Sequence, residues 1–134
     1  MDHVIGAHQV REEEDIIVLT LVGNVSLQEV KQVVSIIDGV IERHGSYGGV
    51  IDIQRLGSFS PEARGVASEW AGVRACYGNA FFGGGFTARV LMILVSRVVR
   101  ITMGNLPPLD FFKSEVDARA WLTVQRERIG KPAP

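Results

Sequence analysis

The spacing of apolar residues divides the chain into short strands and longer helices. Residues 16–22 are β-branched and almost entirely apolar, which predicts a strand that is buried on both faces of a sheet. The acidic run at 12–15 predicts the turn before this strand, and Gly23 with Asn24 predicts its end. Four further strands are expected at 6–10, 50–53, 79–83 and 109–112.

Between the strands, apolar residues recur at helical spacing. Ser26 is a plausible N-cap for the first helix, and Gly45 is a C-terminal stop. Ser60 and Pro61 supply a capping hydroxyl and a first-position proline, which predict a second helix that runs to about Ala75. A third helix is expected over residues 88–101 after Thr87, and a last helix after a capping box formed by Ser114 and Asp117.

The resulting order is strand, strand, helix, strand, helix, strand, helix, strand, helix. Alternation of this kind implies parallel crossovers, whereas the short turn between the first two strands permits antiparallel pairing. We therefore expect an α/β fold with a mixed, mostly parallel five-stranded sheet flanked by four helices. Residues 1–129 are expected to form a single domain, and residues 130–134 a disordered tail.

Composition and charge narrow the functional classes. The 134 residues are 46% hydrophobic and 22% charged, as expected for one globular domain. A net charge of −1 argues against a nucleic-acid partner, which selects a clustered basic surface. One cysteine and three scattered histidines predict neither a disulfide nor a metal site. Because we find no secretory signal and no apolar stretch long enough to span a bilayer, we expect a cytoplasmic protein.

Four segments share a pattern with one known family. They are 50–56 (VIDIQRL), 58–64 (SFSPEAR), 86–91 (FTARVL) after a glycine-rich turn, and 109–112 (LDFF) followed by 114–122. On these segments the chain resembles the SpoIIAA-like, or STAS, family over nearly its whole length. The resemblance implies a sheet flanked by helices, close to the CRAL-TRIO lipid-binding architecture. It also implies a role like that of family members, which act as anti-sigma-factor antagonists or as regulatory domains of transporters.

The resemblance extends only in part to the family's regulatory serine. In bacterial antagonists of this family, a serine at the start of the helix after the third strand is a phosphorylation switch. Ser58 and Ser60 occupy that region here, but the Asp-Ser-Ser-Gly type of motif is absent and Pro61 stands where it would continue. Gly85 likewise replaces the serine of the Gly-x-Ser-Phe turn before the third helix. The sequence therefore argues against a phospho-switch.

Two turns at the carboxyl ends of strands are candidate ligand sites, because ligands of open α/β sheets bind in the crevice outside these ends. In a glycine turn before a helix, the backbone permits close approach and the helix N-terminus favours an anionic group. The alternatives are a plain tight turn for the glycines and a plain N-cap for Ser60. The candidate ligand-binding residues are Arg55, Ser58, Ser60, Gly83, Gly84, Gly85, Thr87 and Arg89.

The second predicted helix has a candidate partner face. Gly65, Ser68 and Gly72 form a stripe of small side chains at helical spacing, which continues to Cys76. Glycines inside a helix cost stability, so the stripe indicates either close approach of a partner or a thin exposed face that needs no larger side chains.

The third predicted helix is broadly apolar with one basic arc. Arg89, Arg97 and Arg100 fall on that arc, whereas the wide apolar arc includes Val90 and Leu94. The basic arc either contacts an anionic membrane or an acidic partner, or it is the solvated edge of a deeply packed helix.

These observations leave three functional hypotheses. The first is a non-enzymatic STAS-like regulatory or binding module that acts through a protein partner. The second is a binder of an apolar small molecule or lipid in a CRAL-TRIO-like pocket. The third is an enzyme recruited onto this scaffold in a biosynthetic pathway, with Asp52, Arg55, Glu69 and Tyr77 as candidate residues. An anionic ligand, peripheral membrane contact and a homodimer stay open, and no metal or cofactor is expected.

Overall fold

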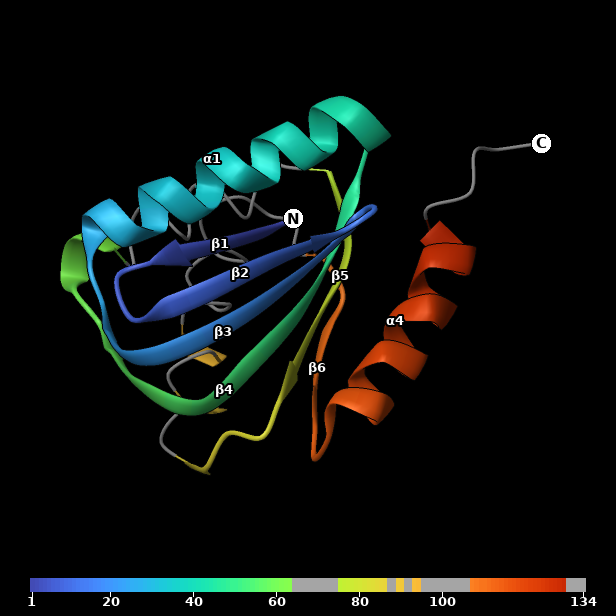
Figure 1. The fold of residues 1–134 in the computed structure, drawn as a ribbon. Helices are drawn as coiled ribbons and strands as arrows, with labels where there is room; N and C mark the ends of the chain where they lie inside the picture. The colour runs from blue at the N-terminus through green and yellow to red at the C-terminus, as the bar shows by residue number, and fades with distance from the viewer. Residues whose placement is uncertain (64–74, 87–88, 91–92, 95–106, 130–134) are drawn as a thin grey trace.

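In a computed structural model, six strands form one sheet and lie side by side in the order in which they occur along the chain (Figure 1). The structure describes residues 1–63, 75–86, 89–90, 93–94 and 107–129. The strands are β1 (Asp2–Ile5), β2 (His8–Glu13), β3 (Ile16–Val25), β4 (Tyr47–Phe59), β5 (Cys76–Phe82) and β6 (Leu109–Phe112). The helices described along their whole length are α1 (Leu27–His44) and α4 (Glu115–Ile129).

The direction of strand pairing changes at β3. The β1–β2 and β2–β3 pairs are antiparallel, whereas β3, β4, β5 and β6 pair with one another in parallel. This confirms the α/β class and the mixed, mostly parallel sheet that the alternation of strands and helices predicted.

The predicted count of five strands is wrong, because the chain begins with a hairpin. β1 pairs with β2 across a two-residue turn, Gly6 and Ala7, in which Gly6 has a φ of +60°. Tight hairpin turns of this kind need a positive φ, so the strand predicted at 6–10 begins inside the turn. A side chain at position 6 would also collide with the carboxylate of Glu29 in α1.

Three strands are longer than predicted. β3 continues through Gly23 and Asn24, where its end was expected, to Val25. β4 runs over Tyr47–Phe59, and its polar second half stays paired with β3 through two register shifts. β5 begins at Cys76, three residues before the predicted start at 79. A strand can continue through polar residues where one face of the sheet is not fully covered. The length predicted from a run of apolar residues alone is then too short.

The predicted helix caps are confirmed. Ser26 Oγ accepts a hydrogen bond from the Glu29 N–H at 3.2 Å, and Glu29 Oε1 accepts one from the Ser26 N–H at 2.9 Å. Gly45 ends α1 in the left-handed region, with a φ of +87°. Ser60 Oγ accepts a hydrogen bond from the Ala63 N–H at 3.1 Å, and residues 61–63 are helical. Local sequence therefore sets these boundaries.

Other helical predictions fall partly on residues that the structure does not describe. Ser114 Oγ accepts a hydrogen bond from the Asp117 N–H at 3.3 Å, as expected at the start of the last helix. Residues 86, 89–90 and 93–94 are helical. The rest of the predicted second and third helices and the tail at 130–134 lie outside the described residues, so the domain limits stay a prediction.

β3 separates two packed faces of the sheet, with α1 on one side and α4 on the other (Figure 1). Ile17 and Leu21 of β3 are buried on the α1 side. Ile16 and Val18 point the opposite way and pack with the core beneath α4. That core consists of Val50, Tyr77, Ala80, Phe82, Ala118 and Leu122.

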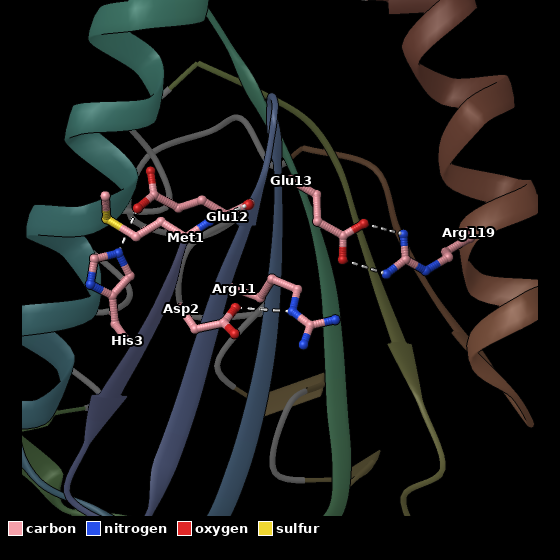
Figure 2. A network of polar contacts seen from close by, with 7 residues as sticks. All are labelled: Met1, Asp2, His3, Arg11, Glu12, Glu13 and Arg119. Atoms are coloured by element: carbon pink, nitrogen blue, oxygen red, sulfur yellow. Dashed lines mark hydrogen bonds and ion pairs between the residues drawn. The ribbon is translucent and has the colours of Figure 1, made fainter.

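Glu12 ties the end of β2 to β1 and to α1, and Figure 2 draws its contact with His3 of β1. Its carboxylate lies 2.5 Å from His3 Nε2 of β1 and forms an ion pair with Arg43 of α1. The hydrogen bond from His3 and the charge of Arg43 hold the pKa of Glu12 below its ordinary value. The hairpin and the helix are therefore joined through one carboxylate.

The acidic residues that follow Glu12, at the turn between β2 and β3, are tied to α4. Glu13 accepts two hydrogen bonds from Arg119 at 2.9 and 3.0 Å, as Figure 2 shows. Arg126, two helical turns further along α4, pairs with the buried Asp15 at 3.1 Å. The hydrogen bonds from Arg119 lower the pKa of Glu13. Because Glu12 and Glu13 point to opposite faces, the acidic turn anchors a helix on each side of the sheet.

We predict that Gly48→Ala lowers the free energy of unfolding by about 1–3 kcal/mol. A Cβ at this position would lie 2.5 Å from ring atoms of Tyr77, which is only 2% exposed and has no room to shift. Gly39→Ala in α1 is the matched control, since its new Cβ would be 3.5 Å from its nearest neighbour. Urea denaturation measures both variants, and equal stabilities would contradict this packing.

We also predict that Glu13→Gln makes the free energy of unfolding less dependent on pH in acid, because this variant has no carboxylate at position 13 to protonate. Because the folded-state pKa lies below the ordinary value of 4.5, the Glu13 pair stabilises the protein above that pH and is lost as pH falls through the lowered pKa. The Arg119 and Glu13 side chains are 33% and 35% exposed. At neutral pH, Glu13→Gln should therefore lower the free energy of unfolding by only about 0.5–1 kcal/mol. Urea denaturation on both sides of pH 4.5 tests this.

The matched control for Glu13→Gln is Glu14→Gln. Glu14 is exposed and makes no ion pair with another described residue. Its neutralisation should leave the pH dependence of unfolding unchanged. If the two variants give the same curve, the contribution of the Glu13 pair is refuted.

Candidate functional site

Three residues singled out in the sequence, Asp52, Arg55 and Ser58, lie on one face of the sheet. Ile16 and Val18 of β3 pack with the α4 core, so the alternation along β3 places its next even-numbered residues on that same face. The strand register pairs Asp52, Arg55 and Ser58 with these even-numbered residues, Thr20, Val22 and Asn24, respectively. The candidate residues therefore form a row along β4 on the α4 side.

α4 covers only part of this face. Its buried residues Ala118 and Leu122 pack against β4 and β5. The ring of Trp121 lies against Phe112 of β6, with ring centroids 5.6 Å apart. No described helix covers this face over β1 and β2, at the edge of the sheet opposite β6 (Figure 1).

The uncovered part of this face is both polar and apolar. Val4 of β1 is 76% exposed. The side chains of Asp2 and Arg11 are 69% and 60% exposed and form an ion pair at 3.0 Å. The register aligns Val4 with Gln9 and Thr20, and Asp2 with Arg11 and Val18. We call the surface formed by Asp2, Val4, Gln9, Arg11 and Thr20 the open sheet face.

Asp52 and Ser58 each make one hydrogen bond, the first within β4 and the second to β3. Asp52 Oδ1 accepts one from the Gln54 N–H at 2.9 Å, and Ser58 Oγ donates one to Asn24 Oδ1 at 2.8 Å. Arg55 is exposed. Ser58 is thus turned toward β3, and the row offers a carboxylate, a guanidinium and a hydroxyl to a polar group.

The residues named for an enzyme are not gathered in one place. Asp52 pairs with Phe82, which lies five residues beyond Tyr77 in β5 and hence about 16 Å along the strand. Tyr77 is buried beneath α4, and burial and the nearby Asp15 raise the pKa of its hydroxyl. Glu69 lies outside the described residues. The described residues therefore bring together Asp52 and Arg55 only.

The glycine turn lies beside the second half of β4. Gly83 has a φ of +80°, and the Gln54 side chain occupies the space that a Cβ at Gly83 would need. The Gly83 N–H donates to the Phe112 carbonyl at 3.1 Å, and the Arg89 N–H donates to the Gly85 carbonyl at 3.1 Å. A tight turn with close packing is sufficient to explain the glycine at position 83, and a ligand at Gly83, Gly84 and Gly85 stays a prediction.

The remaining residues predicted to bind a ligand or a partner are only partly described by the structure. The Ser60 hydroxyl is engaged as an N-cap, and Arg89 is exposed. Thr87 lies outside the described residues, as does the predicted partner face of Gly65, Ser68 and Gly72. The prediction that the helical stripe continues to Cys76 is wrong, because Cys76 is the first residue of β5. Burial raises the pKa of its thiol to about 11, so the thiol stays protonated at neutral pH.

Sequence reasoning did not find an exposed apolar stripe that follows the glycine turn. Phe86, Val90, Ile93 and Leu94 are 83%, 36%, 40% and 50% exposed. Their spacing of i, i+4, i+7 and i+8 places them on one side of a helix. The interpretation of this segment as a deeply packed helix is wrong at Val90 and Leu94. Periodicity reveals an apolar face, but it does not reveal whether that face is covered. We call these four residues the apolar stripe.

Comparisons with known proteins identify the fold. No family model and no curated protein matches the sequence. Among solved structures, a DUF3478-family protein with a SpoIIAA-like fold from Shewanella loihica PV-4 is 19% identical, with a TM-score of 0.60; the match covers 87% of this chain and 92% of that one.

Two structures of SpoIIAA are also similar. The unphosphorylated anti-sigma factor antagonist is 16% identical, with a TM-score of 0.56 and coverage of 87% of this chain and 98% of that one. The phosphorylated Bacillus cell fate determinant is 17% identical, with a TM-score of 0.53 and coverage of 86% and 99%. The TM-scores of 0.53 to 0.60 over most of each chain show a shared fold, and the resemblance that the sequence suggested is confirmed at that level. The chain has the SpoIIAA-like, or STAS, fold.

Proposed function

We propose that this chain is a non-enzymatic STAS-type regulatory module that acts by binding a protein partner. The apolar stripe carries the proposal. Exposing large apolar side chains to water costs free energy, roughly 1.5–3 kcal/mol for each side chain that a partner could bury. Four of them on one side of a helix match the way in which an amphipathic helix inserts into an apolar groove.

The similar structures support a protein as the partner. SpoIIAA is described as an anti-sigma factor antagonist, a role that is defined by another protein. By analogy, we propose that this chain belongs in the cytoplasm and regulates a partner there. Arg89, exposed beside Val90, makes no ion pair with a described residue, so we expect acidic groups at the edge of the partner's groove.

Phosphorylation of a serine is not included in the proposal. The Ser60 hydroxyl accepts the hydrogen bond that caps a helix, and Pro61 follows it. The Ser58 hydroxyl is bonded to Asn24. Because both hydroxyls already make hydrogen bonds within the fold, neither serine is assigned a regulatory phosphate.

A second candidate function also rests on the apolar stripe. Apolar side chains next to an arginine suit an apolar small molecule or the surface of an anionic membrane as well as a protein groove. No helix among the described residues is long and apolar enough to cross a membrane. Native mass spectrometry would detect a copurified apolar ligand, and sedimentation with phosphatidylglycerol vesicles would detect membrane contact.

The partner is to be captured from an extract of the native organism with immobilised chain, identified by mass spectrometry and titrated in purified form by calorimetry. We predict that Phe86→Glu and Ile93→Glu each weaken its binding about tenfold or more, because each places a charge where an apolar side chain is buried. Ser35→Glu, which adds the same charge at an exposed position of α1, is the matched control and should bind normally. Unchanged affinity of both stripe variants would refute the proposal.

A further inference from the structure

His8 is a deeply buried histidine that lies where the β1–β2 hairpin meets the rest of the fold. It is the first residue of β2, directly after the hairpin turn, and is only 1% exposed. The other two histidines differ, because His3 is partly exposed and His44 is exposed. A histidine changes charge over the physiological range of pH, so the contacts of a buried one can depend on whether its ring is protonated.

One ring nitrogen of His8 takes the place of a strand partner for β3. The β2–β3 ladder ends at the pair of Gln9 and Thr20, so no described strand lies beside Val22 on this side of β3. The Val22 N–H instead donates a hydrogen bond to His8 Nδ1 at 3.0 Å. Nδ1 can accept this hydrogen bond only while it carries no proton. The bond therefore requires the neutral ring, with its one proton on Nε2.

The other ring nitrogen of His8 faces the start of α1. His8 Nε2 lies 3.2 Å from Glu29 Oε1, and the same oxygen accepts the Ser26 N–H that belongs to the N-cap of α1. The turn between β1 and β2 lies beside this first helical turn (Figure 1), with Gly6 against the Glu29 carboxylate. One imidazole thus joins the hairpin turn to β3 and to α1.

Glu29 is the one charged group among the described residues that forms an ion pair with His8. β1 contributes Ile5, the residue paired with His8, and β3 contributes the Val22 N–H, and neither carries a charge. The hydrogen bond from the Ser26 N–H lowers the pKa of Glu29, and the contact with His8 also lowers it, so the carboxylate is ionised when histidines titrate. Its charge attracts an imidazolium, but Nε2 already carries a proton in the neutral ring. A further proton therefore brings no new hydrogen bond on this side.

Proton uptake by His8 occurs at Nδ1, on the side of β3. The new N–H would point at the Val22 N–H, and two donors would face each other across 3.0 Å. The ring is too deeply buried for the new N–H to reach water without movement of the hairpin. Acid therefore breaks this hydrogen bond and leaves the Val22 N–H without an acceptor, which opposes the native position of the hairpin.

We propose that His8 is a pH-sensitive contact that controls the turn end of the β1–β2 hairpin. The neutral ring holds this end against β3 and α1, and the protonated ring releases it. The contact is complete above the pH range in which histidines take up a proton, and it is lost as pH falls through that range. At the other end of the hairpin, a protonated His3 keeps its contact with Glu12, because that partner is a carboxylate. The release is thus confined to the turn end, and it goes beyond the proposed function, since it does not involve the apolar stripe.

Hydrogen exchange of the Val22 amide, followed by NMR from about pH 7.5 to about pH 5.5, measures this contact. The protection factor of this amide should fall about tenfold or more as His8 takes up a proton. In His8→Asn the amide oxygen can replace Nδ1 as the acceptor but does not titrate, so the protection factor should not change over this range. His44→Asn, at the exposed end of α1, is the matched control and should behave as the original chain does.

A Val22 protection factor that stays constant in the original chain over this range would overturn the proposal. An equal fall in His8→Asn would also overturn it, because another group would then cause the loss. The nitrogen chemical shifts of the His8 ring test the original chain without any variant. Nδ1 should carry no proton at about pH 7.5, and a proton on Nδ1 at that pH would contradict the proposal.

Discussion

The position of β3 in the sheet decides what every other element can do. It is the strand at which antiparallel pairing with β2 gives way to parallel pairing with β4. Its strict alternation sends Ile17 and Leu21 toward α1 and Ile16 and Val18 toward α4. A shift of one residue in its register would exchange these two sets and leave both helices without a core. The acidic turn before β3 then fixes the helices, through Glu12 on one side and Glu13 on the other.

Local features of the fold were predictable from the sequence. The caps at Ser26, Gly45 and Ser60 depend on residues within a few positions of one another, so they could be found without knowledge of the tertiary structure. The hairpin turn at Gly6 was not recognised, because the strands on either side of it carry too few apolar residues to show a clear alternation. The second half of β4 was not recognised because its polar side chains lie on a partly uncovered face.

The functional surfaces were less predictable than the fold. Asp52, Arg55 and Ser58 were selected as candidates for a crevice, and the register shows instead that they share one sheet face. The ion pairs of Glu12 with Arg43 and Glu13 with Arg119 join residues 31 and 106 positions apart, a separation at which a single sequence carries no pairing signal. Whether an apolar residue such as Phe86 or Val116 is covered depends on packing between distant segments, which hydrophobic periodicity does not report.

In the proposed function, the apolar stripe is the surface that binds a protein partner. Hydrogen–deuterium exchange of the chain with and without its captured partner tests this claim most directly. Bound partner should slow exchange in peptides that contain Phe86 and Ile93 and leave peptides from β1 and α4 unchanged. Slower exchange confined to β1, β2 and α4, with no change around Phe86 and Ile93, would contradict the account.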